Sequence, residues 1–499
     1  MIIRLLLSLL AGATVTAALA PFNQVWLVGL PPLLLFLLLD KAPLKQAPLL
    51  GWFFGLGFFG AGVSWVFVSI YEHSATPLVL AVLLTALFVM ALALLFMVQA
   101  WCWKRWLQGP LATFSFVAIW VLGEWLRSWL LTGFPWLYLG YAATETPLSA
   151  WAPVGGVWLN SLIFVASGLL LFYCFKATTM PRRLISLLLL ILPWALLPLV
   201  SQPWTKVSGE AFTVTLIQAD INQEKKWDPN SLEETLSTYE QLTLPHQGDA
   251  LIIWPETAIS AFFRQASPLI QPLLNQLDDS GSTFISGLPT TSFGADGQRR
   301  YHNSLAVLTG GSGVYHKQRL VPFGEYIPLE NYLRDTLAFF NLPMSGFSLP
   351  SEEQALLSVN GYALASAICY EIAYPELVRL SSRKADFILT VSNDTWFGHS
   401  IAPDQHMQIA RMRALETGRW VIRATNNGIS GLINPDGEIV KQAPRFTQAS
   451  LSGTLEPRNG QTPFQHLGSW PVLIFSLLLC LFSACQTGRQ RRLNQQPDL

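Results

Sequence analysis

The sequence predicts two bodies: a polytopic α-helical bundle in a membrane and a layered α/β domain in water. Three observations predict this division. Hydrophobic residues make up 51% of the 499 residues and charged residues only 12%, which is too apolar for a soluble globular protein of this size. Long apolar stretches fill residues 1–200, and a shorter one fills 468–485. Most of the charges lie between 205 and 465.

The apolar stretches are long enough to cross a bilayer repeatedly, since about 20 apolar residues in a helix cross roughly 30 Å of hydrocarbon. The first stretch could instead be a cleaved signal peptide, because Arg4 precedes an apolar run that ends in small residues. The next run begins within a few residues, which favours a helical hairpin. We predict about eight spans, at residues 4–20, 25–40, 48–70, 77–103, 110–130, 155–175, 184–200 and 468–485.

The basic residues of the short loops indicate the orientation, because Lys and Arg are retained on the cytoplasmic side. With the N-terminus inside, Arg127 is essentially the only basic residue in a short outer loop. Eight spans then return the C-terminus to the cytoplasm. We therefore expect a bundle at 1–203, an outer domain at 204–466, and a last span with a cytoplasmic tail at 467–499. The basic residues placed inside are Arg4, Lys41, Lys45, Lys104, Arg105, Lys176, Arg182, Arg183, Arg489, Arg491 and Arg492.

Charge and composition argue against several other classes of protein. Acidic and basic residues balance at 31 each, and no basic block interleaved with aromatics predicts a nucleic-acid partner. The spans hold few ionisable residues, chiefly Glu124 and Arg127, whereas transporters usually need polar sites inside the membrane. His399, His406 and Met407 lack metal-ligand spacing, so we expect them at the surface or in loops and predict no metal.

The region between 205 and 465 alternates short apolar runs with polar helical stretches. Such alternation predicts a layered α/β domain. We predict helices at 231–243, 266–278, 374–382 and 403–418. The predicted strands are 211–217, 250–254, 282–287, 303–309, 313–316, 362–369, 386–391, 420–424 and 429–433.

Cys369 is the only one of the five cysteines that lies in the predicted outer domain. An unpaired cysteine in an oxidising compartment is either buried and inert or a reactive thiol. A small buried residue at the end of a core strand is the ordinary interpretation. However, the apolar run 362–368 stops abruptly at Cys369, and a strand end followed by a turn can present a nucleophile rigidly to a pocket.

Two more predicted strands end in charge: the run 251–254 precedes Glu256, and the run 313–316 precedes Lys317. A charge beside a core strand must be paired or functional, so the two residues could simply pair with each other. Together with Cys369 they provide what acyl transfer requires. Glu256 can take the thiol proton, and Lys317 can stabilise the oxyanion that follows.

The segments that carry these residues resemble a known superfamily. Trp254-Pro255-Glu256, the stretch 316–325 and the stretch 368–371 look like the Glu-Lys-Cys signatures of the nitrilase, or carbon–nitrogen hydrolase, superfamily. The stretches 393–398 and 410–414 also fit it. The resemblance implies a four-layer αββα sandwich for the outer domain.

A membrane bundle joined to such a domain resembles bacterial apolipoprotein N-acyltransferases, including the stretches 133–136 and 226–228. The resemblance implies a ping-pong reaction on a bacterial inner membrane, with the catalytic domain in the periplasm. A phospholipid would donate an acyl chain to Cys369 as a thioester. The N-terminal amine of a diacylglyceryl-cysteine in an apolipoprotein would then accept it. We expect no cofactor, no nucleic acid and a monomer.

Further residues are candidates for support and for substrate binding. Glu325 and Glu371 could hold Lys317 or adjust the base, and Trp227 and Tyr370 could contact substrate. The stretch 337–347 is unusually apolar for a connection in an exposed domain. It is either ordinary core or, as we prefer, a lid that borders the bilayer and admits acyl chains. Its candidate contact residues are Phe339, Phe340 and Met344.

The main alternative function is a membrane-anchored nitrilase-type amidase that hydrolyses a small amide or nitrile with the same three residues. Against it, a bundle of several spans would be an extravagant anchor. Apolar loops would also serve no polar substrate.

Overall fold

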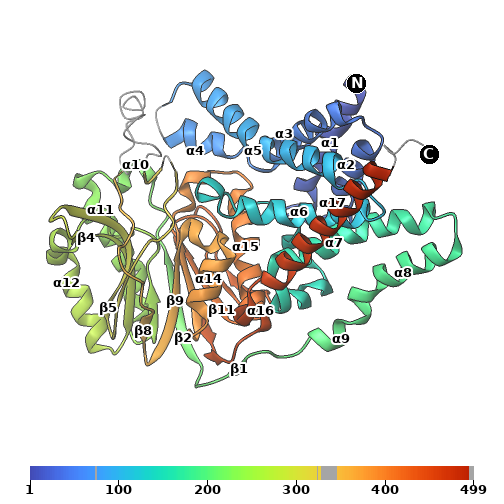
Figure 1. Ribbon diagram of the computed structural model, residues 1–499. Coiled ribbons are helices and arrows are strands. Elements are labelled where there is room, and N and C mark those ends of the chain that lie inside the picture. Colours follow the sequence, from blue (N-terminus) through green and yellow to red (C-terminus); the bar gives the residue numbers. More distant parts are fainter. Residues whose placement is uncertain (74–75, 323, 327–345, 494–499) are drawn as a thin grey trace. The chain divides into compact units, whose positions relative to one another are not determined.

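The computed structural model describes residues 1–73, 76–322, 324–326 and 346–493, and the chain divides into two compact units (Figure 1). The helical unit comprises residues 1–67, 78–202 and 466–499. The α/β unit comprises residues 68–77 and 203–465. The short segment 68–77 therefore belongs to the α/β unit, although it lies within the apolar N-terminal part of the chain.

The helices of the helical unit are apolar, and several begin where proline fits the first turn. Proline lacks an N–H that this turn would leave unpaired, and it occupies the first positions of α2, α3, α7 and α8. The helices are α1 (Ile2–Ala18), α2 (Leu30–Asp40), α3 (Ala47–Gly62), α5 (Leu78–Trp106), α6 (Ala112–Arg127), α7 (Ala152–Lys176), α8 (Met180–Ala195), α9 (Leu197–Val200) and α17 (Trp470–Leu493), with 3-10 turns η1 (Val25–Leu27), η2 (Leu44–Gln46), η3 (Leu130–Thr132), η4 (Leu139–Glu145) and η5 (Pro147–Trp151).

An apolar helix lies in each of the eight predicted spans, but fewer than eight of these helices are long enough to cross a membrane. Among the described residues, four helices are long and apolar enough to cross a membrane. They become five if α3 and α4 (Val66–His73), bent by 56°, count as one. The helix α1 has 17 residues and extends about 25 Å at ~1.5 Å per residue, which is short of the hydrocarbon thickness.

Close helix packing in this unit depends on small residues. A Cβ atom added at Gly12 of α1 would lie 2.0 Å from the carbonyl oxygen of Phe54 in α3. One added at Gly57 of α3 would lie 1.8 Å from the carbonyl oxygen of Leu9. Larger side chains at these positions would force the two backbones apart, as in other membrane helix pairs that pack through glycine.

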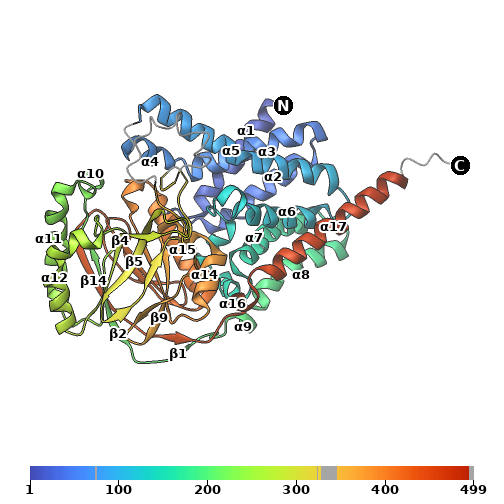
Figure 2. The ribbon, with the colours of Figure 1, turned by 60° about the vertical axis from the view of Figure 1, so that its left-hand side comes forward.

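The α/β unit contains two large sheets that pack face to face with helices outside them, the predicted αββα arrangement (Figures 1 and 2). One sheet has the strand order β14-β2-β3-β4-β5-β7, and the other has the order β13-β12-β11-β10-β9-β8-β6. The strands are β1 (Lys206–Val207), β2 (Phe212–Gln218), β3 (Leu251–Ile253), β4 (Thr283–Phe293), β5 (Arg299–Thr309), β6 (Gly311–Ser312), β7 (Val314–His316), β8 (Leu357–Val359), β9 (Tyr362–Ile368), β10 (Phe387–Ser392), β11 (Trp420–Thr425), β12 (Gly431–Ile433), β13 (Ile439–Gln442), β14 (Ala449–Leu455) and β15 (Arg458–Asn459).

Successive side chains of a strand point to opposite faces of its sheet, so each sheet contributes to two layers of packing. Leu251 and Ile253 of β3 join the core between the sheets, together with residues of β9 and β10. Ile252 and Trp254 point the other way and pack in a second core against the outer helices, as a period of two residues requires. The helices of this unit are α10 (Gln223–Lys226), α11 (Leu232–Thr243), α12 (Phe263–Asp279), α14 (Pro375–Ser382), α15 (Ala402–Thr417) and α16 (Pro463–Leu467), with 3-10 turns η6 (Pro229–Ser231), η7 (Leu244–His246), η8 (Cys369–Ala373) and η9 (Asp394–Phe397).

The parallel strands carry candidate residues at their carboxyl ends. β2, β3 and β4 run parallel in one sheet, and β9, β10 and β11 run parallel in the other. Glu256 follows β3, and Cys369 follows β9 directly. The carboxyl ends of parallel strands are where side chains of open α/β sheets meet ligands.

Candidate active site

Cys369 lies at a strained point of the backbone. It is partly buried, it begins the turn η8 immediately after β9, and its φ is +54°. Residues other than glycine rarely adopt this left-handed conformation unless the surrounding structure holds them there. The sharp turn separates the thiol from the regular run of the strand.

Glu371 holds this turn and is fully buried. Its carboxylate accepts hydrogen bonds from the N–H of Ile368 (2.7 Å), the N–H of Arg319 (3.0 Å), the N–H of Gln318 and the hydroxyl of Tyr315 (3.0 Å). Burial raises the pKa of Glu371 to about 7, although these donors and Lys317 act against the rise. Glu371 thus ties the end of β9 to the segment that follows β7.

Lys317 lies between two carboxylates and is 1% exposed. Its Nζ donates to Oε1 of Glu256 (3.3 Å) and to Oε1 of Glu325 (2.9 Å). The amide of Asn303 donates to the same two oxygens, at 2.8 and 2.9 Å. Burial alone would lower the pKa of Lys317, but Glu256 and Glu325 raise it well above its ordinary value. Lys317 is therefore a permanently charged ammonium.

Glu256 remains ionised beside it. Burial works to raise the pKa of Glu256, but Lys317, Asn303 and Lys226 lower it below its ordinary value. Its second oxygen, Oε2, accepts a hydrogen bond from the N–H of Asn393 (2.8 Å). The carboxylate is thus fixed from three sides.

The thiol of Cys369 interacts electrostatically with both Glu256 and Lys317. Burial and the negative charge of Glu256 raise the pKa of Cys369 to about 12, against the opposite effects of Lys317 and Ser392. The resting thiol is therefore protonated. A reaction at this sulfur needs a base that acts as the new bond forms.

A polar cluster that the sequence did not reveal lies behind Cys369. His406 is fully buried, so the expectation of a surface or loop position is wrong. Its Nε2 lies 3.1 Å from the carbonyl oxygen of Cys369, and its Nδ1 lies 3.1 Å from Nη2 of Arg423. Because arginine only donates, Nδ1 accepts and Nε2 carries the hydrogen. Burial, followed by the charge of Arg423, lowers the pKa of His406, which keeps the ring neutral.

Asp394 completes this cluster. Its carboxylate accepts hydrogen bonds from Nη2 of Arg423 (2.8 Å) and from Oγ of Ser392 (2.6 Å). The sequence of α15 gives no signal for the cluster, because the burial of this helix on almost all its faces is seen only in the structure. A helix with polar residues all round that is nevertheless buried must satisfy them internally.

Ser69 and His73 of α4 contact the loop that follows β10. Oγ of Ser69 donates to the carbonyl oxygen of Trp396 (2.7 Å), and Nε2 of His73 lies 3.0 Å from the carbonyl oxygen of Thr395. The ring of His73 also packs edge-on against Trp396, with centroids 5.2 Å apart. This loop begins at Asn393, which binds Glu256.

The remaining predicted site residues have different placements. Trp227 follows α10, and its buried indole N–H has no hydrogen-bond partner among the described residues. Tyr370 packs edge-on against Tyr374, with ring centroids 5.2 Å apart. The candidate contact residues Phe339, Phe340 and Met344 lie outside the described residues. Within the described part of the chain, no group of three or more His, Cys, Asp and Glu side chains is suited to hold a metal ion.

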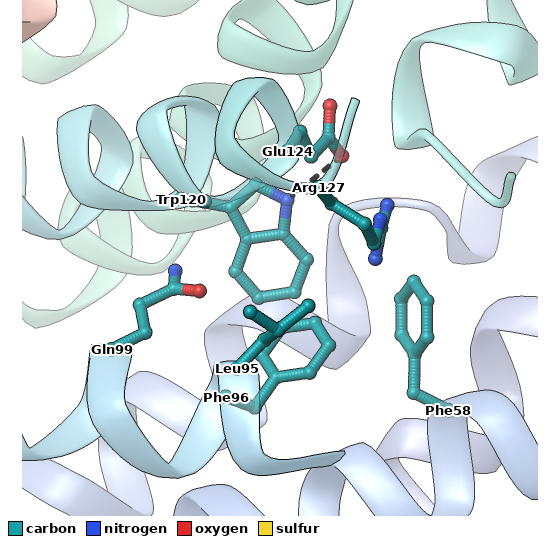
Figure 3. Close-up of a pocket in the computed structure, with 8 residues that line it drawn as sticks. Phe58, Leu95, Phe96, Gln99, Trp120, Glu124 and Arg127 are labelled. Carbon is teal, nitrogen blue, oxygen red and sulfur yellow. Dashed lines mark hydrogen bonds between the residues drawn. The ribbon is translucent and has the colours of Figure 1, made fainter. Parts of the chain in front are cut away.

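A second group of buried charges lies in the helical unit, beside a small pocket (Figure 3). Oε1 of Glu124 accepts hydrogen bonds from the indole of Trp120 (3.1 Å) and from the N–H of Leu139 (3.0 Å). Nη2 of Arg127 donates to the carbonyl oxygen of Leu137 (3.3 Å). The pocket is lined by Phe58, Leu95, Phe96, Gln99, Trp120, Gly123, Glu124 and Arg127.

The αββα sandwich belongs to the class of carbon–nitrogen hydrolases, because the family model described as carbon–nitrogen hydrolase matches residues 213–461. The model of the apolipoprotein N-acyltransferase N-terminal domain matches residues 11–170. The chain belongs to the apolipoprotein N-acyltransferase family.

Relatives match over almost the whole chain. An apolipoprotein N-acyltransferase from Pseudomonas aeruginosa is 45% identical, covering 98% of this chain and 96% of the relative. One from Pseudomonas syringae pv. tomato is 44% identical, covering 95% of each chain. Among solved structures, a CN-hydrolase superfamily protein from Xanthomonas campestris matches with a TM-score of 0.37 and 17% identity, covering 53% of this chain and 97% of that one.

Proposed function

We propose that the protein transfers an acyl chain from a phospholipid, through a thioester on Cys369, to the N-terminal amine of diacylglyceryl-cysteine in apolipoproteins. The observation that carries the proposal is the buried contact of Lys317 with Glu256, next to a thiol held at a strained strand end. The substrates come from the relatives, which are named apolipoprotein N-acyltransferases.

In the first half-reaction the thiol attacks the ester carbonyl carbon of the phospholipid. Glu256 accepts the thiol proton as the C–S bond forms, because the raised pKa of Cys369 keeps the free thiol protonated. The carbonyl oxygen becomes an oxyanion beside the ammonium of Lys317. The C–O bond then breaks, and the lysophospholipid alkoxide leaves with the proton from Glu256.

In the second half-reaction the neutral amine of the acceptor attacks the thioester carbonyl carbon. Glu256 accepts the proton that the amine loses, and Lys317 again faces the oxyanion. The C–S bond breaks, the thiolate takes the proton back from Glu256, and an amide remains on the acceptor. Because the acyl-enzyme forms and the lysophospholipid leaves before the amine attacks, the kinetics should be ping-pong.

The supporting residues follow from their contacts. Glu325 anchors Lys317 through a second hydrogen bond, and Glu371 fixes the turn that carries the thiol. Trp227 and Tyr370 are proposed to contact substrate. The stretch 337–347, with Phe339, Phe340 and Met344, is proposed as a lid.

The membrane arrangement is also a proposal. The apolar helices support a membrane protein. We place it in a bacterial inner membrane as a monomer, with both termini in the cytoplasm and the catalytic domain, residues 204–466, in the periplasm. Residues 1–203 and 467–499 would form the membrane-embedded parts.

The test is to incubate purified protein with a labelled phospholipid and to search by mass spectrometry for an acyl adduct on Cys369. We expect an adduct that disappears when a diacylglyceryl-cysteine peptide is added, with the label then on the peptide amine. Cys369→Ala should carry none, whereas the control Cys485→Ala should behave as wild type. Hydrolysis of a small amide by wild type but not by Cys369→Ala, with no acyl adduct from phospholipid, would favour the amidase instead.

A further inference from the structure

Lys226 is a second buried lysine near the thiol. It ends the short helix α10 and is 2% exposed. Its Nζ donates to the main-chain carbonyl oxygen of Glu256 (2.9 Å), which is its only hydrogen bond to a residue that the structure describes. Burying an ammonium against a single neutral acceptor is costly. An apolar side chain at this position would avoid that cost, so a role in packing alone does not account for a lysine here.

The helix α10 holds Glu256 by two routes. Lys226 binds its main-chain carbonyl oxygen directly. Oε1 of Gln223 accepts a hydrogen bond from the side chain of Asn393 (2.7 Å), and the N–H of Asn393 donates to the Glu256 carboxylate (2.8 Å). Both ends of the Glu256 residue, its backbone and its carboxylate, are thus connected to the same helix.

Lys226 offsets an excess negative charge in the group that Lys317 forms with its two carboxylate partners. Lys317 binds two carboxylates, those of Glu256 and Glu325, so these three groups together carry a net charge of minus one. An excess negative charge in a buried site opposes the formation of a thiolate or an oxyanion. A second ammonium brings the group to neutrality before the reaction begins.

The ionisation of Lys226 responds to the same groups. Burial lowers the pKa of Lys226 to about 8, while the negative charges of Glu256 and of an ionised Cys369 act to raise it. Lys226 is therefore mostly charged near neutral pH and loses its proton above about pH 8. Lys317, in contrast, stays charged well beyond that range.

We propose that Lys226 is a positioning residue of the acyl-transfer site, which holds Glu256 by its main chain and offsets the negative charge that develops when Cys369 attacks an ester. The inference rests on the proposed function. It assigns to the site a second cation whose role differs from that of Lys317, because it binds no carboxylate oxygen among the described residues.

The experiment measures the rate at which labelled phospholipid acylates Cys369, at pH values on both sides of about 8, in the full-length protein. Loss of one preorganised electrostatic partner commonly slows a reaction by about 10²-fold or more, so Lys226→Met should acylate about 100-fold more slowly than wild type at neutral pH. Lys226→Arg should restore most of the rate. Lys225→Met, a change at the exposed neighbour on the same helix, should have little effect.

The pH profile separates this role from simple packing. The wild-type rate should fall as Lys226 loses its proton, whereas Lys226→Arg, which does not titrate there, should keep its rate above about pH 8. This comparison decides the matter even if Lys226→Met folds poorly. Equal profiles for wild type and Lys226→Arg, or a wild-type rate in Lys226→Met, would overturn the inference. A wild-type protein that forms no adduct would overturn the proposed function instead.

Discussion

The buried charged side chains of the two units have different partners. In the helical unit, Glu124 and Arg127 bind the backbone of the irregular stretch at Leu137 and Leu139. In the α/β unit, Glu256 and Lys317 bind each other beside a thiol. Irregular backbone at membrane depth needs partners inside the protein because lipid supplies none. The first pair therefore supports the fold, whereas the second is the pair that we propose takes part in acyl transfer.

The aromatic rings around Arg127 are a second difference between the two groups of buried charges. The guanidinium of Arg127 lies over the rings of Phe58 and Tyr138, 5.4 and 5.1 Å from their centroids, so part of its charge is met by aromatic faces. Lys317 has carboxylate partners and no ring of this kind in the described structure. A cation balanced by ionised groups can change its interactions when a new anion forms nearby. A cation enclosed by rings and carbonyl groups has no such freedom.

The largest effect should come from breaking the charge group of the α/β unit. Lys317→Met removes the ammonium between Glu256 and Glu325 and leaves two carboxylates unbalanced. Acylation of Cys369 should fall by about 10³-fold or more, since the oxyanion loses its partner. Breaking a buried pair should also cost ~3–5 kcal/mol of folding stability. Adduct formation and thermal unfolding measure the two losses.

The matched control for this change is Lys384→Met, at an exposed lysine of the same unit. It should alter neither quantity appreciably. If Lys317→Met acylated Cys369 at the wild-type rate, Lys317 would have only a structural role, like the one that we assign to Glu124 and Arg127 in the helical unit.

The second prediction concerns the helical unit, where a change at a buried charge should lower the folding stability but leave the acylation rate nearly unchanged. Glu124→Gln removes the negative charge that accepts hydrogen bonds from Trp120 and Leu139 and that interacts electrostatically with Arg127. It should destabilise the unit by about 1–3 kcal/mol. Acylation per folded molecule should remain within about twofold of wild type, because no reacting group is touched. Thermal unfolding in detergent and adduct formation test the two statements.

A double variant sharpens this prediction. Removing both charges with Glu124→Gln and Arg127→Met should cost less than the sum of the single changes, since neither charge is then left alone. Additive losses would show that the two residues act independently on the backbone.

The sequence predicted the strands that carry the site well. The predicted strand 362–369 is β9, the predicted strand 250–254 contains β3, and the three residues proposed for catalysis lie close together. An apolar run that ends at a charge or a thiol is a local signal, so it can be read along the chain. The roles of those residues in catalysis remain predictions.

Features that depend on distant contacts were missed. The burial of His406 requires Arg423 and the backbone of Cys369, and none of these is near it in sequence. The break at residues 63–65, after which the chain joins the α/β unit, falls within an apolar run that we predicted as a single span. Apolar composition alone does not distinguish a helix that bends from one that continues.

A third effect concerns His406, whose neutral ring lies behind the thiol. His406→Leu removes the donor to the carbonyl oxygen of Cys369 and leaves Arg423 with fewer acceptors. It should cost ~1–3 kcal/mol of stability and slow acylation about tenfold, because the strained turn is less well held. His406→Gln keeps a donor near the same place and should recover much of the rate. Equal rates in both variants would indicate a role in packing only.

The smallest expected effect concerns the segment 68–77, which lies in the apolar part of the sequence but packs with the α/β unit. Ser69→Ala removes one hydrogen bond to the carbonyl oxygen of Trp396 and should cost ~1 kcal/mol. Ser64→Ala, a change at an exposed serine, is the matched control. Hydrogen exchange should show faster opening of residues 393–398 in Ser69→Ala and not in the control.

Because Asn393 begins this loop and binds Glu256, a small fall in the acylation rate should accompany the faster exchange. Faster exchange with an unchanged rate would mean that the segment stabilises the loop without aligning the base.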